Sequence, residues 1–329
     1  KAILNTDVKV IKLLDRSFNA KTEHALEILD FVFKHARPGV QLQFEINGDV
    51  LDQRIIDFIN EEAPDGLLRF EIGIQSTYEP TNKIVRRYQN FERLCDVIKQ
   101  LQQNHKIDFH LDLIAGLPLE NLQRFSKSFD DVFRLYRKEL QLGFLRLVRG
   151  KSLRYEANKY GYVYQQEAPY ELIESHDLSK EDIEKIHLAE DMLQKYWNSG
   201  RMPITMNKVL RACASPFYFF LDLGEFYQAN DFKFFGFQLD ELFQYLNLYL
   251  KGRYEDELIE DYLRLSKVKP KKWWKPRIEN EKETKHLLID TYHLNKEDVF
   301  RYGIVEKLKE EYILVLYKNY QVTVEKYHI

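Results

Sequence analysis

The chain has 329 residues, of which 44% are hydrophobic and 31% are charged, and its formal net charge is −3. This length allows one large domain or two medium ones, while the near-balanced charge excludes a general attraction to nucleic acid or to an anionic membrane. The sequence has no run of about 18 apolar residues, so no membrane span is predicted. Its first residues lack the apolar core of a signal peptide. Two cysteines, Cys95 and Cys213, favour a reducing, cytoplasmic setting without a disulfide framework.

Strand and helix patterns alternate through the first half of the chain. Short apolar or alternating runs predict strands at 8–14, 42–46, 68–74, 109–114 and 140–147. Between them, apolar residues at helical spacing predict helices at 21–36, 52–62, 90–103 and 125–140. Repeated βαβ units indicate a parallel sheet with helices outside it. Both a (β/α) barrel and an open doubly wound sheet satisfy this α/β pattern.

The pattern changes after about residue 150. A polar, Tyr-rich stretch is followed by Ser179 and Asp182, which are spaced as a capping box at the start of a helix ending near Gly200. Residues 205–265 look largely helical and aromatic, and 312–328 reads as a β-hairpin. We therefore expect a partial barrel over 1–150, a linker over 151–178 and a mainly helical accessory domain over 179–329.

Polar residues gather where the predicted strands end, which is where parallel α/β folds bind ligands. Three acids, Glu45, Glu71 and Asp112, lie inside apolar runs, so each must be paired, hydrogen-bonded or turned toward a polar interior. The ordinary alternative is that strand ends are polar in any globular protein. On that reading, Glu45 is simply a buried partner of Arg69.

Several of these segments resemble one protein family. FEIGIQS (70–76), DLIAGLP (112–118) followed by Glu120, LQLGFLRLVRG (140–150) and LLDRSFNA (13–20) resemble the radical S-adenosylmethionine (radical SAM) barrel. APYELIESHDLS (168–179) and YWNSGRM (196–202) resemble the cobalamin-binding radical SAM proteins that carry a C-terminal domain of unknown function. Such proteins are often labelled magnesium-protoporphyrin IX monomethyl ester oxidative cyclase-like, a label that sets no substrate.

The resemblance implies a radical SAM enzyme. S-adenosylmethionine would bind against a 4Fe–4S cluster and give a 5′-deoxyadenosyl radical. Cobalamin in the full-length protein would add methyl transfer or oxidative cyclisation on an unknown small-molecule substrate. On the matching positions, Glu45, Gln75 and Ser76 would face the amino acid and ribose groups of the cofactor, and Asp15 would lie on the rim beside the cluster and the substrate.

Four further positions receive roles from the same resemblance. Arg86 or Arg87 would pair the cofactor carboxylate, a task that suits a guanidinium fork. Gly116 and Pro118 would shape the turn beneath the adenine. Each role has an ordinary alternative: the two arginines are also typical of a solvated helix end, and the Gly-Leu-Pro turn of a loop with special geometry.

The chain departs from the family at its cysteines. Members hold the cluster through a C-x-x-x-C-x-x-C loop after the first barrel strand, and that motif is absent here. The first strand of this chain corresponds to the second of the family. We therefore expect the cysteine loop upstream of Lys1, this chain alone to be inactive, and the edge at VKVIKLL to be covered by the accessory domain or by a neighbouring chain in an oligomer.

Other patterns point to different functions. KVKPKKWWKPR (267–277) combines basic and aromatic residues, as an RNA-modifying enzyme would require, but is also typical of a linker whose tryptophans pack on the helical domain. His110 and Asp112 should point to one face of a strand, although two residues alone do not define a metal site. A non-catalytic barrel that binds a small molecule or a partner protein is the remaining alternative.

Overall fold

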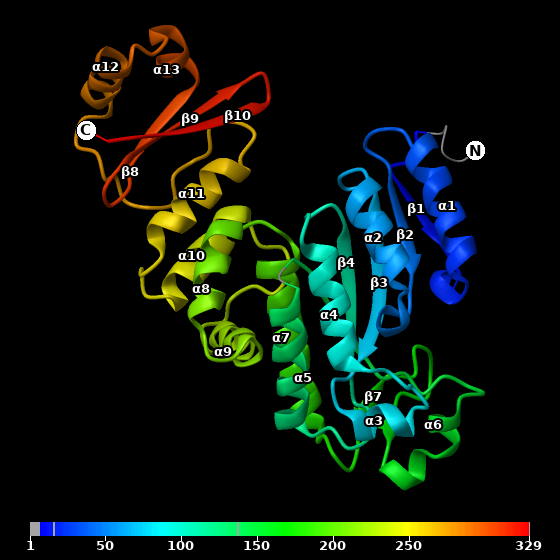
Figure 1. The fold of residues 1–329 in the computed structure, drawn as a ribbon. Coiled ribbons are helices and arrows are strands. Elements are labelled where there is room, and N and C mark those ends of the chain that lie inside the picture. Colours follow the sequence, from blue (N-terminus) through cyan, green and yellow to red (C-terminus); the bar gives the residue numbers. More distant parts are fainter. Residues whose placement is uncertain (1–6, 16, 137, 329) are drawn as a thin grey trace. The chain divides into compact units, whose positions relative to one another are not determined.

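The computed structural model describes residues 7–15, 17–136 and 138–328, which form two compact units (Figure 1). The first unit holds the chain up to Glu190 together with Ser215–Leu221. The second holds Asp191–Ala214 and the chain from Asp222 onward.

The first unit is built on a sheet of five parallel strands. They are β1 (Val10–Leu13), β2 (Gln41–Glu45), β3 (Leu68–Gln75), β4 (Asp108–Ala115) and β5 (Leu140–Phe144). Each strand pairs with the one before it in the chain, in the order β1-β2-β3-β4-β5. A doubly wound sheet reverses its strand order at a switch point, whereas this sheet continues in one direction, as a barrel does. The fold is therefore a partial (β/α) barrel.

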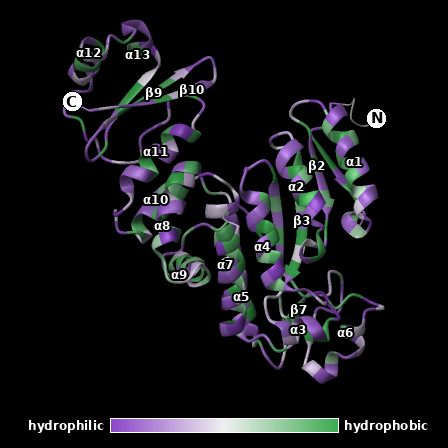
Figure 2. Cartoon of the chain, in the orientation of Figure 1, coloured by the Kyte–Doolittle hydropathy of each residue, from purple (hydrophilic) through white to green (hydrophobic). Residues whose placement is uncertain are grey.

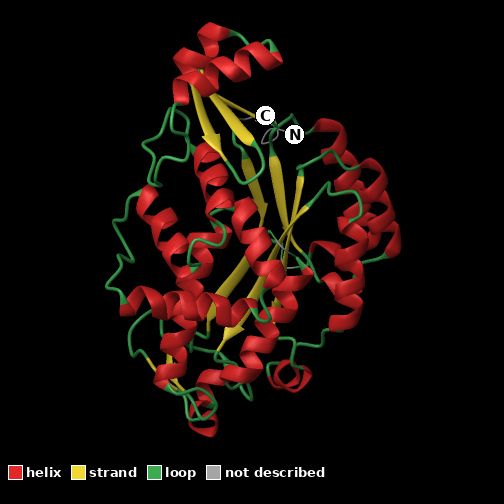
Figure 3. Ribbon diagram, turned by 90° about the vertical axis from the view of Figure 1, so that its left-hand side faces the viewer, coloured by secondary structure: helices red, strands yellow, loops and turns green. Residues whose placement is uncertain are grey.

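Helices cover one face of this sheet (Figures 1 and 3). The long ones are α1 (Thr22–His35), α2 (Gln53–Glu62), α4 (Phe91–Gln102) and α5 (Leu122–Leu135). Figure 2 shows that α2 and α4 are hydrophobic on one side and hydrophilic on the other. The predicted helix at 125–140 begins earlier, because the Asn121 side chain accepts a hydrogen bond from the Arg124 amide and caps its first turn, and it ends earlier, at Leu135.

Three short helices complete the carboxyl ends of the strands: η2 (Phe18–Ala20), η3 (Gly48–Val50) and α3 (Glu79–Ile84). Beyond β5 lie α6 (Ser152–Tyr155), η4 (Ala157–Tyr160), β6 (Val163–Tyr164) and β7 (Leu172–Glu174). The chain after β5 pairs with the start of β7 and the residues just before it, since the Leu147 amide donates to the Tyr170 carbonyl at 2.8 Å and the Leu172 amide to the Leu145 carbonyl at 2.9 Å. The linker predicted at 151–178 remains a prediction.

Helix α7 (Lys180–Leu193) follows the predicted capping box and continues as the π-helix η5 (Gln194–Asn198). The Asp182 amide donates to Ser179 Oγ at 3.1 Å, and the Ser179 amide donates to Asp182 Oδ2 at 3.0 Å, so the capping box is confirmed. The aromatic region contains the helices α8 (Pro203–Ala212), α9 (Pro216–Ala229), α10 (Leu239–Tyr249) and α11 (Glu255–Leu265).

The chain ends with α12 (Glu281–Tyr292), α13 (Lys296–Tyr302) and the antiparallel strands β8 (Gly303–Lys307), β9 (Tyr312–Lys318) and β10 (Gln321–Tyr327). The predicted hairpin, β9 with β10, is confirmed, and β8 adds an unpredicted third strand. Leu288, Val299, Val305 and Leu314 form the buried core of this part. No helix among the described residues is long and apolar enough to cross a lipid bilayer.

Candidate functional site

The sheet face opposite the helices is polar. Along β3, Phe70, Ile72 and Ile74 are buried, while Arg69 and Glu71 alternate with them and are only half-buried. Alternate residues of a strand point to opposite faces, so the second set lines the face away from the helices. Parallel strands covered on both sides are usually apolar throughout. The charged second face is therefore the place where the first unit can hold a polar ligand.

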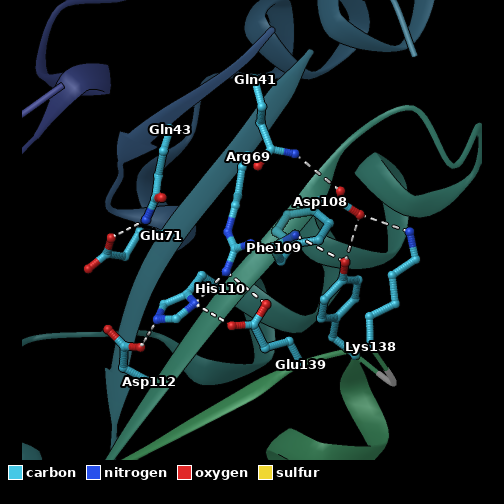
Figure 4. Close-up of polar contacts among 11 residues, drawn as sticks. Gln41, Gln43, Arg69, Glu71, Asp108, Phe109, His110, Asp112, Lys138 and Glu139 are labelled. Carbon is cyan, nitrogen blue, oxygen red and sulfur yellow. Dashed lines mark hydrogen bonds and ion pairs between the residues drawn. The ribbon is translucent and has the colours of Figure 1, made fainter. Parts of the chain in front are cut away.

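A charged network crosses this face between β3 and β5 (Figure 4). Arg69 Nη2 lies 2.7 Å from Glu139 Oε2. His110 lies between two carboxylates, with its Nδ1 3.1 Å from Glu139 Oε1 and its Nε2 3.1 Å from Asp112 Oδ1. His110 and Asp112 thus share one strand face, as predicted. Around them, no group of three or more metal-binding side chains occurs in the described parts of the chain.

The two carboxylates control the charge of His110. Hydrogen bonds to Asp112 and then to Glu139 raise the pKa of His110 from 6.5 to about 9, against an opposing effect of burial. In return, the hydrogen bond from His110 lowers the pKa of Glu139. Arg69 Nη2 also lies 2.8 Å from His110 Nδ1, and its charge opposes protonation of the ring. The two carboxylates around His110 favour the protonated ring, and the single guanidinium of Arg69 opposes it. We therefore infer that His110 is charged at neutral pH.

Glu45 does not pair with Arg69, and that ordinary alternative is wrong. Arg69 is occupied by Glu139 and His110, whereas Glu45 is exposed at the carboxyl end of β2. Glu45 is the register partner of Glu71, which accepts a 2.5 Å hydrogen bond from Gln43. Two carboxylates at directly opposed positions repel each other. This end of the sheet consequently favours a cationic or hydrogen-bond-donating group.

A β-bulge shapes the carboxyl end of β3. The register against β4 shifts between Gly73 and Gln75, and Gln75 has a left-handed backbone with φ of 68°. Arg87 Nη2 donates a hydrogen bond to the Gly73 carbonyl, so its guanidinium lies over the bulge. A Cβ atom at Gly73 would lie 3.5 Å from Arg87 Nη2 and from Gln75 Nε2, so all three residues meet at one point. Bulges often occur next to ligand sites, where they redirect side chains.

The two candidate arginines behave differently. Arg86 is exposed and has a left-handed backbone with φ of 57°. Arg87 is half-buried, and burial lowers the pKa of its guanidinium, an effect that the nearby carboxylates of Asp49, Glu45 and Asp112 oppose. Arg87 is thus the arginine that the structure brings to the predicted ligand end of the sheet.

Ser76 lies apart from Gln75. It is fully buried, and its hydroxyl accepts a hydrogen bond from the Tyr78 amide at 2.9 Å. Its neighbour Glu120 is also fully buried, accepts a 2.8 Å hydrogen bond from Ser128, and has its pKa raised by burial. Ser76 therefore belongs to this interior network, whereas Gln75, whose Nε2 would lie 3.5 Å from a Cβ atom at Gly73, stays beside the bulge.

The remaining predicted positions lie in loops beyond the strands. Gly116 has φ of +95°, and a Cβ atom there would lie 2.3 Å from Leu172 Cδ2, so this turn requires glycine. Pro118 is buried, and its carbonyl accepts a 2.6 Å hydrogen bond from Thr81 Oγ1. Asp15 is exposed after β1 and accepts a 3.4 Å hydrogen bond from the Ser17 amide.

The cysteines do not fit an iron–sulfur cluster. Cys95 lies on α4, where burial raises the pKa of its thiol, and Cys213 follows α8 in the second unit. A cluster of the predicted kind needs three closely placed thiolates, and the chain has two cysteines in all. These residues therefore support no step that runs through a cluster held by this chain.

The basic aromatic segment at 267–277 is packed within the second unit. Trp274 is 6% exposed, and its ring centroid lies 5.9 Å from that of Tyr262. Trp274 Nε1 donates a 2.8 Å hydrogen bond to the buried Glu306, which also lies 3.0 Å from Lys272 Nζ. The predicted packing of a tryptophan on the helical domain is confirmed.

Comparisons with known proteins find a family match for each half of the chain. Residues 4–132 match the family model of the radical SAM superfamily, and residues 158–327 match that of the protein of unknown function DUF4080. No curated protein matches the chain.

Two solved structures show similarity to part of it. Coproporphyrinogen III oxidase from Escherichia coli is 16% identical over 53% of this chain and 37% of its own, with a TM-score of 0.39. The radical S-adenosylmethionine methyltransferase TsrM from Kitasatospora setae, solved with cobalamin and a 4Fe–4S cluster, is 15% identical over 44% of this chain and 29% of its own, with a TM-score of 0.37. The chain thus spans well under half the length of either protein.

Proposed function

We propose that this chain, which belongs to the DUF4080 family and whose residues 4–132 match the radical SAM superfamily, is part of a radical SAM enzyme that binds S-adenosylmethionine at the carboxyl ends of β2 and β3. The observation that carries the location is the Arg87 guanidinium, which lies over the bulge of β3 within the field of three carboxylates. A positive group surrounded by acids suits a ligand that carries both a carboxylate and an ammonium group.

Each residue has a role in this proposal. Arg87 pairs the carboxylate of the cofactor, Glu45 accepts from its ammonium group, and Gln75 contacts the ribose. Gly116 and Pro118 form the turn under the adenine. Ser76 is too deeply buried to contact the cofactor directly, so we assign it to the network with Glu120 that supports the end of β3.

The proposed reaction needs a cluster that these residues cannot hold. When both are bound, S-adenosylmethionine and a reduced 4Fe–4S cluster supply a 5′-deoxyadenosyl radical. We propose that the cluster thiolates come from outside the 329 residues and that the chain alone is inactive. Methyl transfer or oxidative cyclisation with cobalamin, on an unknown substrate, is the more detailed proposal; it rests on the sequence resemblance of the 168–179 and 196–202 segments.

The test uses the full-length protein with its cluster reconstituted without oxygen. We expect release of 5′-deoxyadenosine, and addition of cobalamin distinguishes the methyl-transfer subtype. Arg87→Met should weaken the binding of S-adenosylmethionine at least tenfold, since a hydrogen-bonded charge contributes about 1.5 to 3 kcal/mol. The exposed neighbour provides the matched control, and Arg86→Met should bind normally. A full-length protein that ligates a cluster yet never cleaves the cofactor would instead support a non-catalytic barrel.

A further inference from the structure

A cluster of cations without acidic partners follows β5 in the first unit. Residues 146–164 contain five basic residues and one acidic residue, a balance of +4 within a chain whose net charge is −3. Lys159 Nζ lies 3.1 Å from the carboxylate of that acid, Glu156. The other four cations form no ion pair with any described residue; they are Arg146, Arg149, Lys151 and Arg154. The segment therefore concentrates positive charge that the chain itself does not neutralise.

Tyrosine rings hold two of these guanidinium groups. The guanidinium carbon of Arg154 lies 5.0 Å from the ring centroid of Tyr164 and 4.8 Å from that of Tyr170. The guanidinium carbon of Arg149 lies 5.6 Å from the ring centroid of Tyr170. Rings and cations thus alternate in the order Tyr164, Arg154, Tyr170, Arg149. Cations at this range are attracted to the face of a ring, so the exposed Arg149 at the end of the series is oriented by Tyr170.

The backbone supports this series of rings and cations. Arg154 is half-buried, and its Nη1 donates a 2.6 Å hydrogen bond to the Leu147 carbonyl. The Leu147 amide donates in turn to the Tyr170 carbonyl at 2.8 Å. Tyr170 has a left-handed backbone with φ of 60°, a strained conformation for a residue other than glycine, and strained residues gather at ligand sites. These contacts build a preformed surface and not a set of independent side chains.

The chemistry of this surface fits phosphates that alternate with aromatic bases. Arginines and lysines bind the phosphates of a single strand, while tyrosine rings and guanidinium planes stack on its bases. Tyr155, which lies on α6 beside Arg154 and is 79% exposed, offers a ring for such stacking. An acidic peptide would satisfy the cations but has no bases, and a lipid surface would require an amphipathic helix, whereas α6 has four residues. Single-stranded nucleic acid is the partner that uses both features.

We propose that an Arg–Tyr surface binds single-stranded nucleic acid; it consists of Arg146, Arg149, Lys151, Arg154, Tyr155 and Tyr170. The three exposed cations contact phosphates, Tyr155 stacks on a base, and Tyr170 positions the Arg149 guanidinium. The net charge of −3 gives the chain as a whole no such attraction, so binding is local. The surface uses none of the residues proposed to hold S-adenosylmethionine and goes beyond the proposed function. Release of 5′-deoxyadenosine tests that function without reference to the Arg–Tyr surface, so the two can fail separately.

Fluorescence anisotropy measures binding to the 329-residue chain over a range of salt concentrations. The probes are labelled single-stranded RNA and DNA of mixed sequence, the matching duplexes, polyglutamate, and vesicles that contain phosphatidylserine. We expect the single strands of RNA, DNA or both to bind more tightly than the duplexes. Three phosphate contacts at about 0.7 each should give log Kd a slope of about 2 against log salt concentration. Absence of single-strand binding, or equal binding of duplexes, polyglutamate or vesicles, would overturn the proposal.

Variants tie this binding to the Arg–Tyr surface. Tyr155→Ala should weaken binding about fivefold or more by removing a stacked ring, whereas Tyr155→Phe keeps the ring and should bind normally. Tyr320→Ala removes a ring that is 81% exposed between β9 and β10 and should have no effect. Lys151→Met should lower the salt slope by about 0.7. Lys275→Met removes an exposed lysine from the basic segment at 267–277 and should leave the slope unchanged. Equal effects of the two alanine variants, or of the two lysine variants, would contradict the assignment.

Discussion

The charge of His110 is the property of the polar face that can be tested most directly. Its imidazole lies 3.1 Å from a carboxylate oxygen on each side, from Asp112 and Glu139. Asp112→Asn removes one negative charge but keeps an oxygen that can accept the same hydrogen bond. Since an opposite charge at this range shifts a pKa by about 1 to 3, we expect the pKa of His110 to fall from about 9 by at least 1 in this variant.

The same contacts predict how stability depends on pH. The pKa of His110 is raised in the folded state, so its stabilising effect is complete below 6.5 and is lost as pH rises from 6.5 to about 9. The full difference corresponds to about 3 kcal/mol. The side chains of His110 and Asp112 remain 17% and 26% exposed, and Arg69 opposes the protonated ring. Solvent screening and that opposition reduce the expected change to about 1 to 2 kcal/mol.

Two measurements check this reasoning. An NMR titration of labelled histidine, assigned with His110→Gln, gives the pKa, and urea unfolding at pH 6 and pH 9 gives the free energy. Asp108→Asn is the matched control, because Asp108 lies on the same strand face and pairs with Lys138 at 2.8 Å rather than with His110. A pKa near 6.5 in the unmodified chain would refute the assignment, and so would equal effects of the two substitutions. Arg69 would then be the dominant neighbour.

Two further predictions concern stability. Gly116→Ala should destabilise the chain by about 2 to 4 kcal/mol in urea unfolding, because the new Cβ atom clashes with Leu172 and the left-handed backbone is strained for alanine. Gly39→Ala should cost only about 1 kcal/mol, because Gly39 has a left-handed φ of +81° but nothing lies within 4 Å of its Cβ position. Trp274→Phe should cost about 1.5 to 3 kcal/mol by removing a hydrogen bond to the buried carboxylate of Glu306. Trp273→Phe should cost less in the same assay, since Trp273 Nε1 has no partner among the described residues; equal costs would contradict this account.

Much of the fold followed from local sequence patterns. Strand and helix periodicity in the first half located all five strands of the sheet, and the spacing of Ser179 and Asp182 located the start of α7. These features depend on neighbours in sequence, which is why a single sequence reveals them. Strand β8 was missed, because Gly303–Lys307 follows a helix without a turn signal and pairs with β9 through contacts beyond its own segment.

The ligand end of the sheet was harder to predict, since it depends on a bulge. The residues at 70–76 indicated that polar groups follow β3, but they gave no sign that the register shifts between Gly73 and Gln75. That shift, with the left-handed Gln75, leaves Gln75 beside Arg87 while Ser76 turns into the interior. The sequence alone does not distinguish Arg86 from Arg87, because only the folded loop directs the Arg87 guanidinium to the Gly73 carbonyl.

The cavity beside η3, lined in part by Asn82, Arg87 and Gln89, could not be predicted from the sequence. Asn82 Oδ1, Gln89 Oε1 and Arg87 Nε are buried without a hydrogen-bond partner among the described residues. Asn82 lies in the short helix α3, and Arg87 and Gln89 lie in the loop that follows it, where solvent normally pairs polar groups. A segment distant in the sequence is held against this loop, because Asp49 of η3 accepts a hydrogen bond from the Asn90 amide at 2.9 Å. Arg87 contributes to both the bulge and the cavity, through Nη2 and Nε respectively.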